Sequence, residues 1–170
     1  MQSDYIDKDT FRHILAALTE PNRLAVEVSL ATGLRISDVL NIKTAQLKNG
    51  KFTALERKTG KRKTVKLNDE LLSALLSISG PIYVWSNRID CRRPRTRQAV
   101  YKDIKRAADA FRVKNLNISP HSARKIYAVT QYHKSGSLSK VQHLLNHSDE
   151  AVTMIYAIAD QVSSRRKTRR

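Results

Sequence analysis

Six side chains with acid–base or anion-binding chemistry stand in short, distinct settings along the chain. They are Arg35, Lys58, His121, Arg124, His147 and Tyr156. His121 and Arg124 are three residues apart, so on a helix both would project from the same face. Arginine binds phosphate or carboxylate oxygens through a planar fork, and tyrosine can be a nucleophile when a base or a positive field helps it to ionise. The residue types therefore allow chemistry at an anionic centre such as a phosphate.

Each of these residues also has an ordinary structural interpretation when it is taken alone. Arg35 precedes Asp38 by three residues on a predicted helix, so the two could form a salt bridge. Lys58 lies in a strongly basic stretch, where a plain phosphate contact is its simplest use. His147 could cap a helix, and Tyr156 could belong to the core. Only the joint order and spacing of the six residues distinguishes the catalytic interpretation.

Helices should position most of these side chains. Apolar residues at helical spacing, with capping residues and early prolines, indicate where the helices lie. The expected ranges are about 10–18, 21–33, 36–42, 68–79, 96–113, 120–134, 138–145 and 149–158. Gly33 is expected to end the second of these helices in a left-handed turn.

The region between residues 47 and 67 has a different, extended character. Asn49-Gly50 is a strong tight-turn pair, and residues 59–61 suggest a second turn. We therefore expect a small antiparallel sheet of about three strands. The apolar segment 82–85 reads as a short strand or a loop anchored in the core. The fold class is α+β, mainly helical, with the sheet packed against helices.

The charge of the chain points to a densely anionic partner. There are 32 Lys and Arg against 15 Asp and Glu, which gives a net charge of +17. Basic and acidic residues cancel within residues 1–50, so the whole excess lies beyond residue 50. Nucleic acid is the natural partner for such clusters. The alternative is a basic surface that serves solubility or attraction to a membrane.

Other features limit the cellular setting and the cofactors. The single cysteine, Cys91, cannot form an internal disulfide, which favours a cytoplasmic or otherwise reducing compartment. There is no apolar run long enough to span a membrane and no secretion signal. His143 and His147 have the spacing of zinc ligands, but neither an HExxH glutamate nor a cysteine cluster accompanies them, so no metal is expected.

Four motifs resemble those of the tyrosine recombinase (phage integrase) family. In chain order they read ATGLRISDVLNI, ERKTGKRKTVKL, HSARK and LLNHSDEAVTMIY. Together the resemblance covers roughly residues 5–160. The commonest form of the last motif has glycine where this chain has Asn146, and asparagine also tolerates the left-handed conformation.

The resemblance implies a catalytic domain over residues 1–160 that cleaves and rejoins DNA. Arg35 and Arg124 would clamp the scissile phosphate, and His147 would donate a further hydrogen bond to it. Tyr156 would attack and form a covalent 3′-phosphotyrosine link, which conserves the bond energy, so that neither ATP nor a metal or other cofactor is needed. Asp38 would orient Arg35 or a neighbouring side chain.

The same resemblance implies that two further residues transfer protons. Free tyrosine has a pKa of about 10, so His121 is the candidate base for Tyr156. Lys58 is the candidate acid for the departing 5′ hydroxyl. Tyr127 and Tyr132 lie close to Arg124 in sequence, but neither has the setting of the family's nucleophile.

The resemblance also implies that the partner is double-stranded DNA and that the other basic residues contact the DNA backbone. The expected contacts are Arg57, Lys61, Arg62, Lys63, Arg92, Arg93, Arg95, Arg97 and a basic, disordered tail at 161–170. Family members usually carry a separate core-binding domain before the catalytic one, and this chain begins almost at the latter. A homotetramer is expected on paired sites, and a monomer in solution. Accessory DNA-bending proteins are a further partner class, and the setting is the cytoplasm of a bacterial cell or phage host.

Two other functions compete with site-specific recombination. A type IB topoisomerase uses the same chemistry to relax supercoils. A non-catalytic regulator would bind DNA without cutting it, although the complete set of catalytic residues argues against this. Target sequence and biological outcome, such as integration, excision or inversion, are not encoded in any motif.

Overall fold

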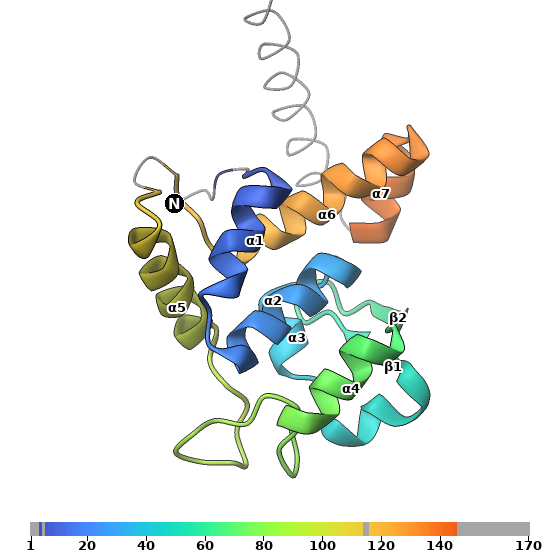
Figure 1. The fold of residues 1–170 in the computed structure, drawn as a ribbon. Helices are drawn as coiled ribbons and strands as arrows, with labels where there is room; N and C mark the ends of the chain where they lie inside the picture. The colour runs from blue at the N-terminus through green and yellow to red at the C-terminus, as the bar shows by residue number, and fades with distance from the viewer. Residues whose placement is uncertain (1–3, 5, 114–115, 146–170) are drawn as a thin grey trace, which may run out of the picture.

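The computed structural model describes residues 4, 6–113 and 116–145. Within them the chain forms seven α-helices, one 3-10 helix and a two-stranded sheet (Figure 1), which confirms the mainly helical α+β class. In chain order the elements are α1 (Lys8–Ala16), α2 (Glu20–Thr32), α3 (Ile36–Leu40), η1 (Thr44–Gly50), β1 (Lys51–Leu55), β2 (Arg62–Lys66), α4 (Asp69–Ile78), α5 (Arg97–Ala110), α6 (Pro120–Ser135) and α7 (Leu138–Leu145).

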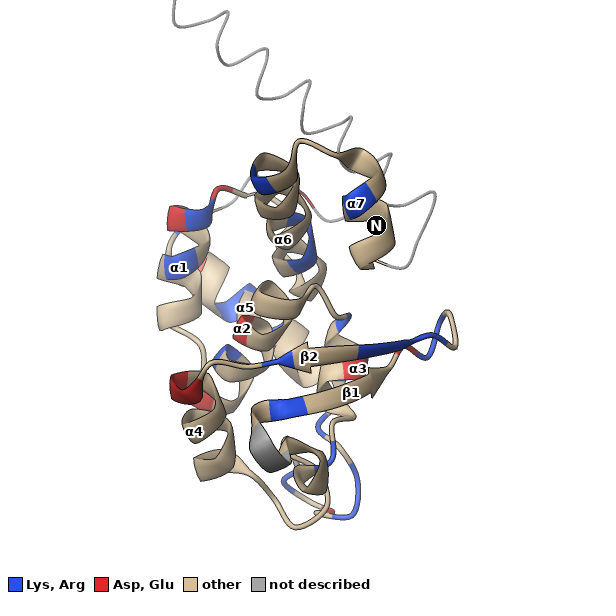
Figure 2. Cartoon of the chain, turned by 90° about the vertical axis from the view of Figure 1, so that its right-hand side faces the viewer, with Lys and Arg blue, Asp and Glu red and all other residues tan. Residues whose placement is uncertain are grey.

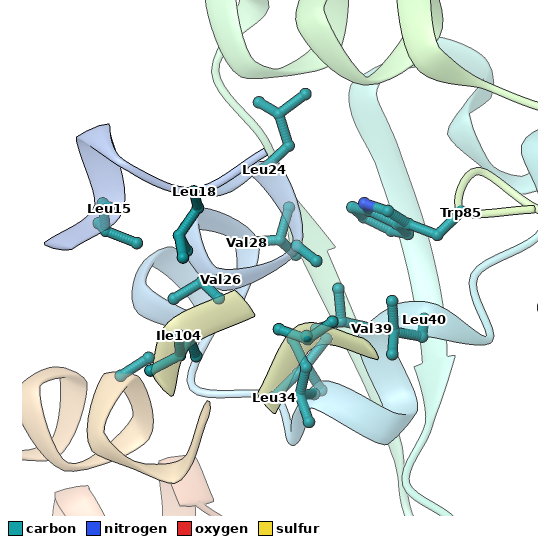
Figure 3. Packing of buried hydrophobic residues seen from close by; sticks show 14 of the residues in the cluster. Leu15, Leu18, Leu24, Val26, Val28, Leu34, Val39, Leu40, Trp85 and Ile104 are labelled. Atoms are coloured by element: carbon teal, nitrogen blue, oxygen red, sulfur yellow. The ribbon is translucent and has the colours of Figure 1, made fainter. Parts of the chain in front are cut away.

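Helix α2 occupies the centre of the domain. Pro21 fits its first turn, where a missing N–H costs no helical hydrogen bond, and Gly33 ends it with a φ of 71°. Figure 3 shows buried side chains of α1, α2, α3 and α5 in one cluster, with Trp85 at one side of it. The Trp85 indole donates to the Pro21 carbonyl at 2.7 Å, which ties the connection after α4 to the start of α2. Helix α2 is therefore anchored at its start, and Arg35 lies three residues after its last residue, Thr32.

A buried carboxylate also fixes the start of α2. Asp103 on α5 accepts hydrogen bonds from the Thr19 backbone N–H and hydroxyl and from the Asn22 amide, at 2.7–2.9 Å. Arg106 also pairs with it at 2.7 Å. Burial by itself would raise the pKa of Asp103, but the hydrogen bonds from Asn22, Arg106 and Thr19 lower it to about 2. The carboxylate is thus held in its charged form at neutral pH.

Replacing Asp103 with alanine should lower the free energy of unfolding near pH 7 by about 2–4 kcal/mol, because buried donors lose a charged acceptor. A depressed pKa stabilises the fold above the ordinary value of 3.8, and that contribution is lost as the pH falls towards about 2. Urea unfolding should therefore show a difference from wild type that shrinks on acidification. Asp109→Ala, at an exposed position of α5, is the control, and an equal loss there would contradict the assignment.

Strands β1 and β2 form an antiparallel hairpin that carries much of the basic charge. Phe52 pairs with Val65, and Ala54 pairs with Lys63. Phe52, Ala54 and Val65 are buried, whereas the alternate positions face solvent. Figure 2 shows Lys and Arg gathered towards the outer end of the hairpin. The alternation anchors one face of the hairpin and presents its turn outward.

The described residues contain two strands where about three were expected. The segment Thr44–Gly50 forms η1 instead of an extended strand, so Asn49-Gly50 does not form a hairpin turn. Leu47 is buried while Ala45 and Gln46 are exposed, which lacks the two-residue alternation of a strand. The apolar segment 82–85 contributes only an isolated bridge between Lys43 and Tyr83, with Val84 and Trp85 buried.

Helix boundaries agree with the sequence predictions to within a few residues. The main difference is α1, which begins after Asp7, and not after Asp9 or Thr10. Asp7 caps it by accepting from the Thr10 N–H at 2.9 Å, and this hydrogen bond is the main cause of the lowered pKa of Asp7. The predicted last helix, His147, Tyr156 and the basic tail lie outside the described residues.

Candidate active site

Arg35 is held by a buried carboxylate at the base of the hairpin. It is the residue before α3, and its Nη1 donates to Glu56 Oε2 at 2.9 Å. The side chain of Glu56 is 1% exposed and that of Arg35 is 12% exposed. Glu56 directly follows β1 and continues the inward alternation of Phe52 and Ala54. The ion pair therefore joins the α2–α3 connection to the hairpin.

Asp38 contacts the same hairpin from α3. Its Oδ1 accepts from the Arg57 backbone N–H at 3.2 Å, and its buried Oδ2 has no hydrogen-bond partner within the described part of the chain. Burial raises the pKa of Asp38, and the charge of Glu56 adds to this. The Arg57 N–H and the charges of Arg35 and Arg124 act in the opposite direction. Asp38 thus fixes the backbone beside Lys58, within the electrostatic reach of both arginines.

Arg124, on α6, is almost fully buried. Helix α6 begins at Pro120 with Ser119 as its N-cap, and this places Arg124 in its second turn. Its Nη1 donates to the Gly33 carbonyl and its Nη2 to the Leu145 carbonyl, each at 2.8 Å. The guanidinium therefore bridges the end of α2 and the end of α7 as far as α7 is described.

Arg35 and Arg124 belong to one cluster, although 88 residues separate them in sequence. Arg124 donates to the carbonyl of Gly33, two residues before Arg35, and both cations act on Asp38. His121 is partly buried, one turn before Arg124 on α6. Lys58 is exposed in the hairpin turn. The structure thus groups two of the predicted arginines with Asp38.

A sequence model of the Phage integrase family matches residues 4–162. The chain belongs to the phage integrase family. A tyrosine recombinase of Thermosipho africanus (strain TCF52B) is 28% identical over 169 residues, which cover 93% of this chain and 58% of that protein. The tyrosine recombinase XerD of Rhizobium meliloti (strain 1021) is 30% identical over 141 residues, which cover 77% of this chain and 45% of that protein. The chain spans about half the length of these curated relatives.

Solved structures of phage integrase relatives share the fold. A lambda integrase dimer bound to a COC′ core site aligns with a TM-score of 0.74 and 23% identity, covering 91% of this chain and 48% of that one. The lambda integrase catalytic core aligns with a TM-score of 0.71 and 23% identity, covering 88% of this chain and 94% of that one. The architecture is therefore that of an integrase catalytic core.

The basic residues predicted to contact DNA fall into two groups in this family member. Six are exposed on the hairpin, on the loop before α5 and at the first residue of α5, namely Arg57, Lys61, Arg62, Arg92, Arg93 and Arg97. Arg95 and Lys63 instead make internal hydrogen bonds. Arg95 Nε donates to Asn22 Oδ1 at 2.6 Å, and burial lowers its pKa. The Lys63 ammonium donates to two backbone carbonyls of the domain.

Sequence reasoning missed Glu56 and assigned no structural role to Tyr127. The inward positions of Phe52 and Ala54 predict an inward Glu56, and a buried carboxylate needs a cation such as Arg35. The Tyr127 ring lies against Gly33, which is recognisable only in three dimensions. Burial raises the pKa of Tyr127 more than the Arg124 charge lowers it, so its phenol stays protonated and is a poor nucleophile.

The described part of the chain contains neither a metal-binding cluster nor a membrane-spanning helix. Within residues 4–145, apart from the gaps at 5 and 114–115, no group of three or more His, Cys, Asp or Glu side chains could hold a metal ion. In that same part of the chain, no helix combines the length and apolar character that crossing a bilayer requires.

Proposed function

We propose that this chain is the catalytic part of a site-specific DNA recombinase or integrase that works through a 3′-phosphotyrosine intermediate at Tyr156. The observation that carries the proposal is the clustering of Arg35 and Arg124 around Asp38 and Glu56. Phage integrase membership supports it, as do relatives named tyrosine recombinase and a solved relative, XerH, described in a post-cleavage complex with its difH substrate.

The two arginines would stabilise charge on the non-bridging oxygens of the scissile phosphate. A preorganised donor of this kind is worth about 3–4 kcal/mol in other enzymes. Arg124 is already oriented by two carbonyls and Arg35 by Glu56, so little side-chain entropy remains to be lost when the phosphate arrives. His147 would supply a further hydrogen bond to the phosphate.

Proton transfer would involve His121, Lys58 and Tyr156, without a metal or ATP. His121 is the proposed base that helps Tyr156 to ionise, and Lys58 is the proposed acid that protonates the departing 5′ hydroxyl. The exposure of Lys58 in the turn suits contact with a DNA strand. The Asp38–Arg57 hydrogen bond holds the backbone next to Lys58. These roles extend the arginine cluster to a complete cleavage reaction.

Double-stranded DNA is the proposed substrate, bound partly through the exposed basic residues of the hairpin and the loop before α5. The whole protein is proposed to act as a homotetramer on two paired sites and to be monomeric without DNA. A lambda integrase tetramer bound to a Holliday junction is among the structural neighbours. Accessory DNA-bending proteins belong to the same proposal, which places the reaction in the cytoplasm of a bacterial or phage-infected cell.

Replacing both Arg57 and Arg62 with alanine should weaken DNA binding uniformly across sequences. Each lost phosphate contact lowers the magnitude of the slope of log K against log salt by about 1, so the pair should lower it by about 2. Fluorescence anisotropy with a mixed-sequence duplex measures the slope. Lys8→Ala with Arg12→Ala on α1 removes the same charge away from the hairpin, and an equal effect there would contradict a specific DNA-binding face.

The proposed function is tested with nicked suicide duplexes built from the DNA that flanks the gene. Wild-type protein should form an adduct that survives denaturant and should exchange strands between two sites. Relaxation of any supercoiled plasmid without strand exchange would favour the topoisomerase alternative. Binding without an adduct across the candidate sites, at low salt, would favour the non-catalytic regulator.

A further inference from the structure

We infer that Lys63 is a positioning residue that joins the DNA-facing hairpin to the end of α7, and so sets the start of the segment that leads to His147 and Tyr156. This inference rests on the proposed function, because it concerns the same site. It replaces the phosphate contact predicted for Lys63 with an internal role.

The Lys63 ammonium connects three parts of the chain. Its Nζ donates to the Thr32 carbonyl and to the Leu144 carbonyl, each at 2.7 Å. Arg124 makes the same connection one residue further along, from the Gly33 carbonyl to the Leu145 carbonyl. Two cations from different elements therefore bridge the end of α2 and the last turn of α7. The Lys63 bridge alone also includes the hairpin.

The pairing of the hairpin explains why Lys63 turns inward. Lys63 is the cross-strand partner of the buried Ala54, so the two share the inner face of the sheet. The exposed neighbours Arg62 and Lys66 occupy alternate positions. Carbonyls in the last turn of a helix carry partial negative charge, which favours a cation there.

Two charged side chains and one aromatic ring act on the Lys63 ammonium. Glu56 attracts it, Arg124 repels it, and the Tyr127 ring centroid lies 5.3 Å from its Nζ. Burial is the main cause that lowers the pKa of Lys63 to about 8, with a smaller contribution from Arg124. An ammonium has three donors, and two of them serve the carbonyls. Lys63 therefore has the geometry of a largely buried lysine that bridges two backbone carbonyls, and not that of a surface lysine.

Within the described residues, helix α7 packs mainly against α6. Its buried Val141 and Leu145 pack with Tyr127, Ala128 and Val129 of α6 in a small cluster separate from the main core. A small cluster gives limited hydrophobic stabilisation, so polar bridges weigh more in holding the end of α7. DNA contacts on the outer part of the hairpin would thereby be connected to α7 through Lys63.

Hydrogen exchange of α7 tests the inference without any DNA substrate. Lys63→Met should accelerate exchange of the amides in α7 on the order of tenfold relative to wild type, with little change in α2 and α5. Lys63→Arg keeps the charge and the donors and should restore part of the protection. Lys66→Met, at an exposed position of the same strand, is the matched control. Unchanged exchange in α7, or equal acceleration in all helices, would overturn the inference.

Two measurements complete the test. In wild-type protein, NMR of the lysine side chains should show the Lys63 ammonium protected from solvent and titrating near pH 8. An ordinary, freely exchanging Lys63 ammonium would overturn the inference even if Lys63→Met failed to fold. On a cleavable site, Lys63→Met should slow adduct formation while DNA affinity stays near wild type. A loss of DNA affinity with an unchanged cleavage rate would show that Lys63 contacts a DNA phosphate and does not position α7. That result would overturn the inference and leave the recombinase proposal intact.

Discussion

Arg35→Lys is expected to slow covalent adduct formation by about 10²–10³-fold while the domain stays folded. A lysine keeps the positive charge next to Glu56, so the buried carboxylate is not left alone. It loses the planar fork that can hold Glu56 and a phosphate oxygen together. The rate is measured under single-turnover conditions with a suicide duplex, at a protein concentration that saturates the DNA.

Arg23→Lys is the matched control for this substitution. Arg23 on α2 also pairs with a carboxylate, Glu27, at 2.8 Å, but that pair is partly exposed and lies within α2. It should leave both stability and adduct formation close to wild type. If Arg35→Lys cleaved DNA as fast as Arg23→Lys, Arg35 would be a structural ion-pair residue. Its proposed contact with the scissile phosphate would then be contradicted.

Gly33→Ala should be among the most destabilising single substitutions in the domain, costing about 3 kcal/mol of unfolding free energy. Gly33 has a φ of 71°, where a side chain costs about 1–2 kcal/mol. A Cβ at this position would also lie 2.5 Å from two ring atoms of Tyr127, and overpacking of this kind adds about 1–3 kcal/mol. The Gly33 carbonyl is an acceptor of Arg124, so cleavage should fall with stability.

Gly136→Ala separates the cost of the left-handed backbone conformation from the cost of the clash with the Tyr127 ring. Gly136 has nearly the same backbone conformation, with a φ of 62°, but a Cβ there would meet nothing within 4 Å. Urea unfolding should show a loss of about 1 kcal/mol for Gly136→Ala. Adding Tyr127→Leu to Gly33→Ala should recover part of the additional loss, because it removes the clashing ring. Equal losses for the two glycine variants would contradict the close packing of Gly33 against Tyr127.

Local signals predicted the helices well and the hairpin partly. Gly33, Asn68 and Pro120 mark helix ends through their own backbone or capping preferences, and the structure uses each of them in that way. The choice between a third strand and η1 depends on how Leu47 reaches the core, which no local pattern near Asn49-Gly50 records. Element boundaries were therefore predictable, but the number of strands was not.

The candidate site shows a similar division. The family motifs selected Arg35 and Arg124, and the structure brings them into one cluster. The internal roles of Glu56 and Lys63 were not predicted, because charged residues in a basic hairpin are normally assigned to the surface. Their burial follows from strand alternation together with partners that lie elsewhere in the chain. Such partners become visible only when the fold is known.

Peptide mapping of the DNA adduct by mass spectrometry tests the central claim most directly. After cleavage of a suicide duplex and nuclease trimming, the protein should carry a residual nucleotide on Tyr156 through a 3′-phosphate, and Tyr156→Phe should carry none. Attachment at Tyr127 or Tyr132, or an adduct that persists in Tyr156→Phe, would contradict a phosphate site built from Arg35, Arg124 and that hydroxyl.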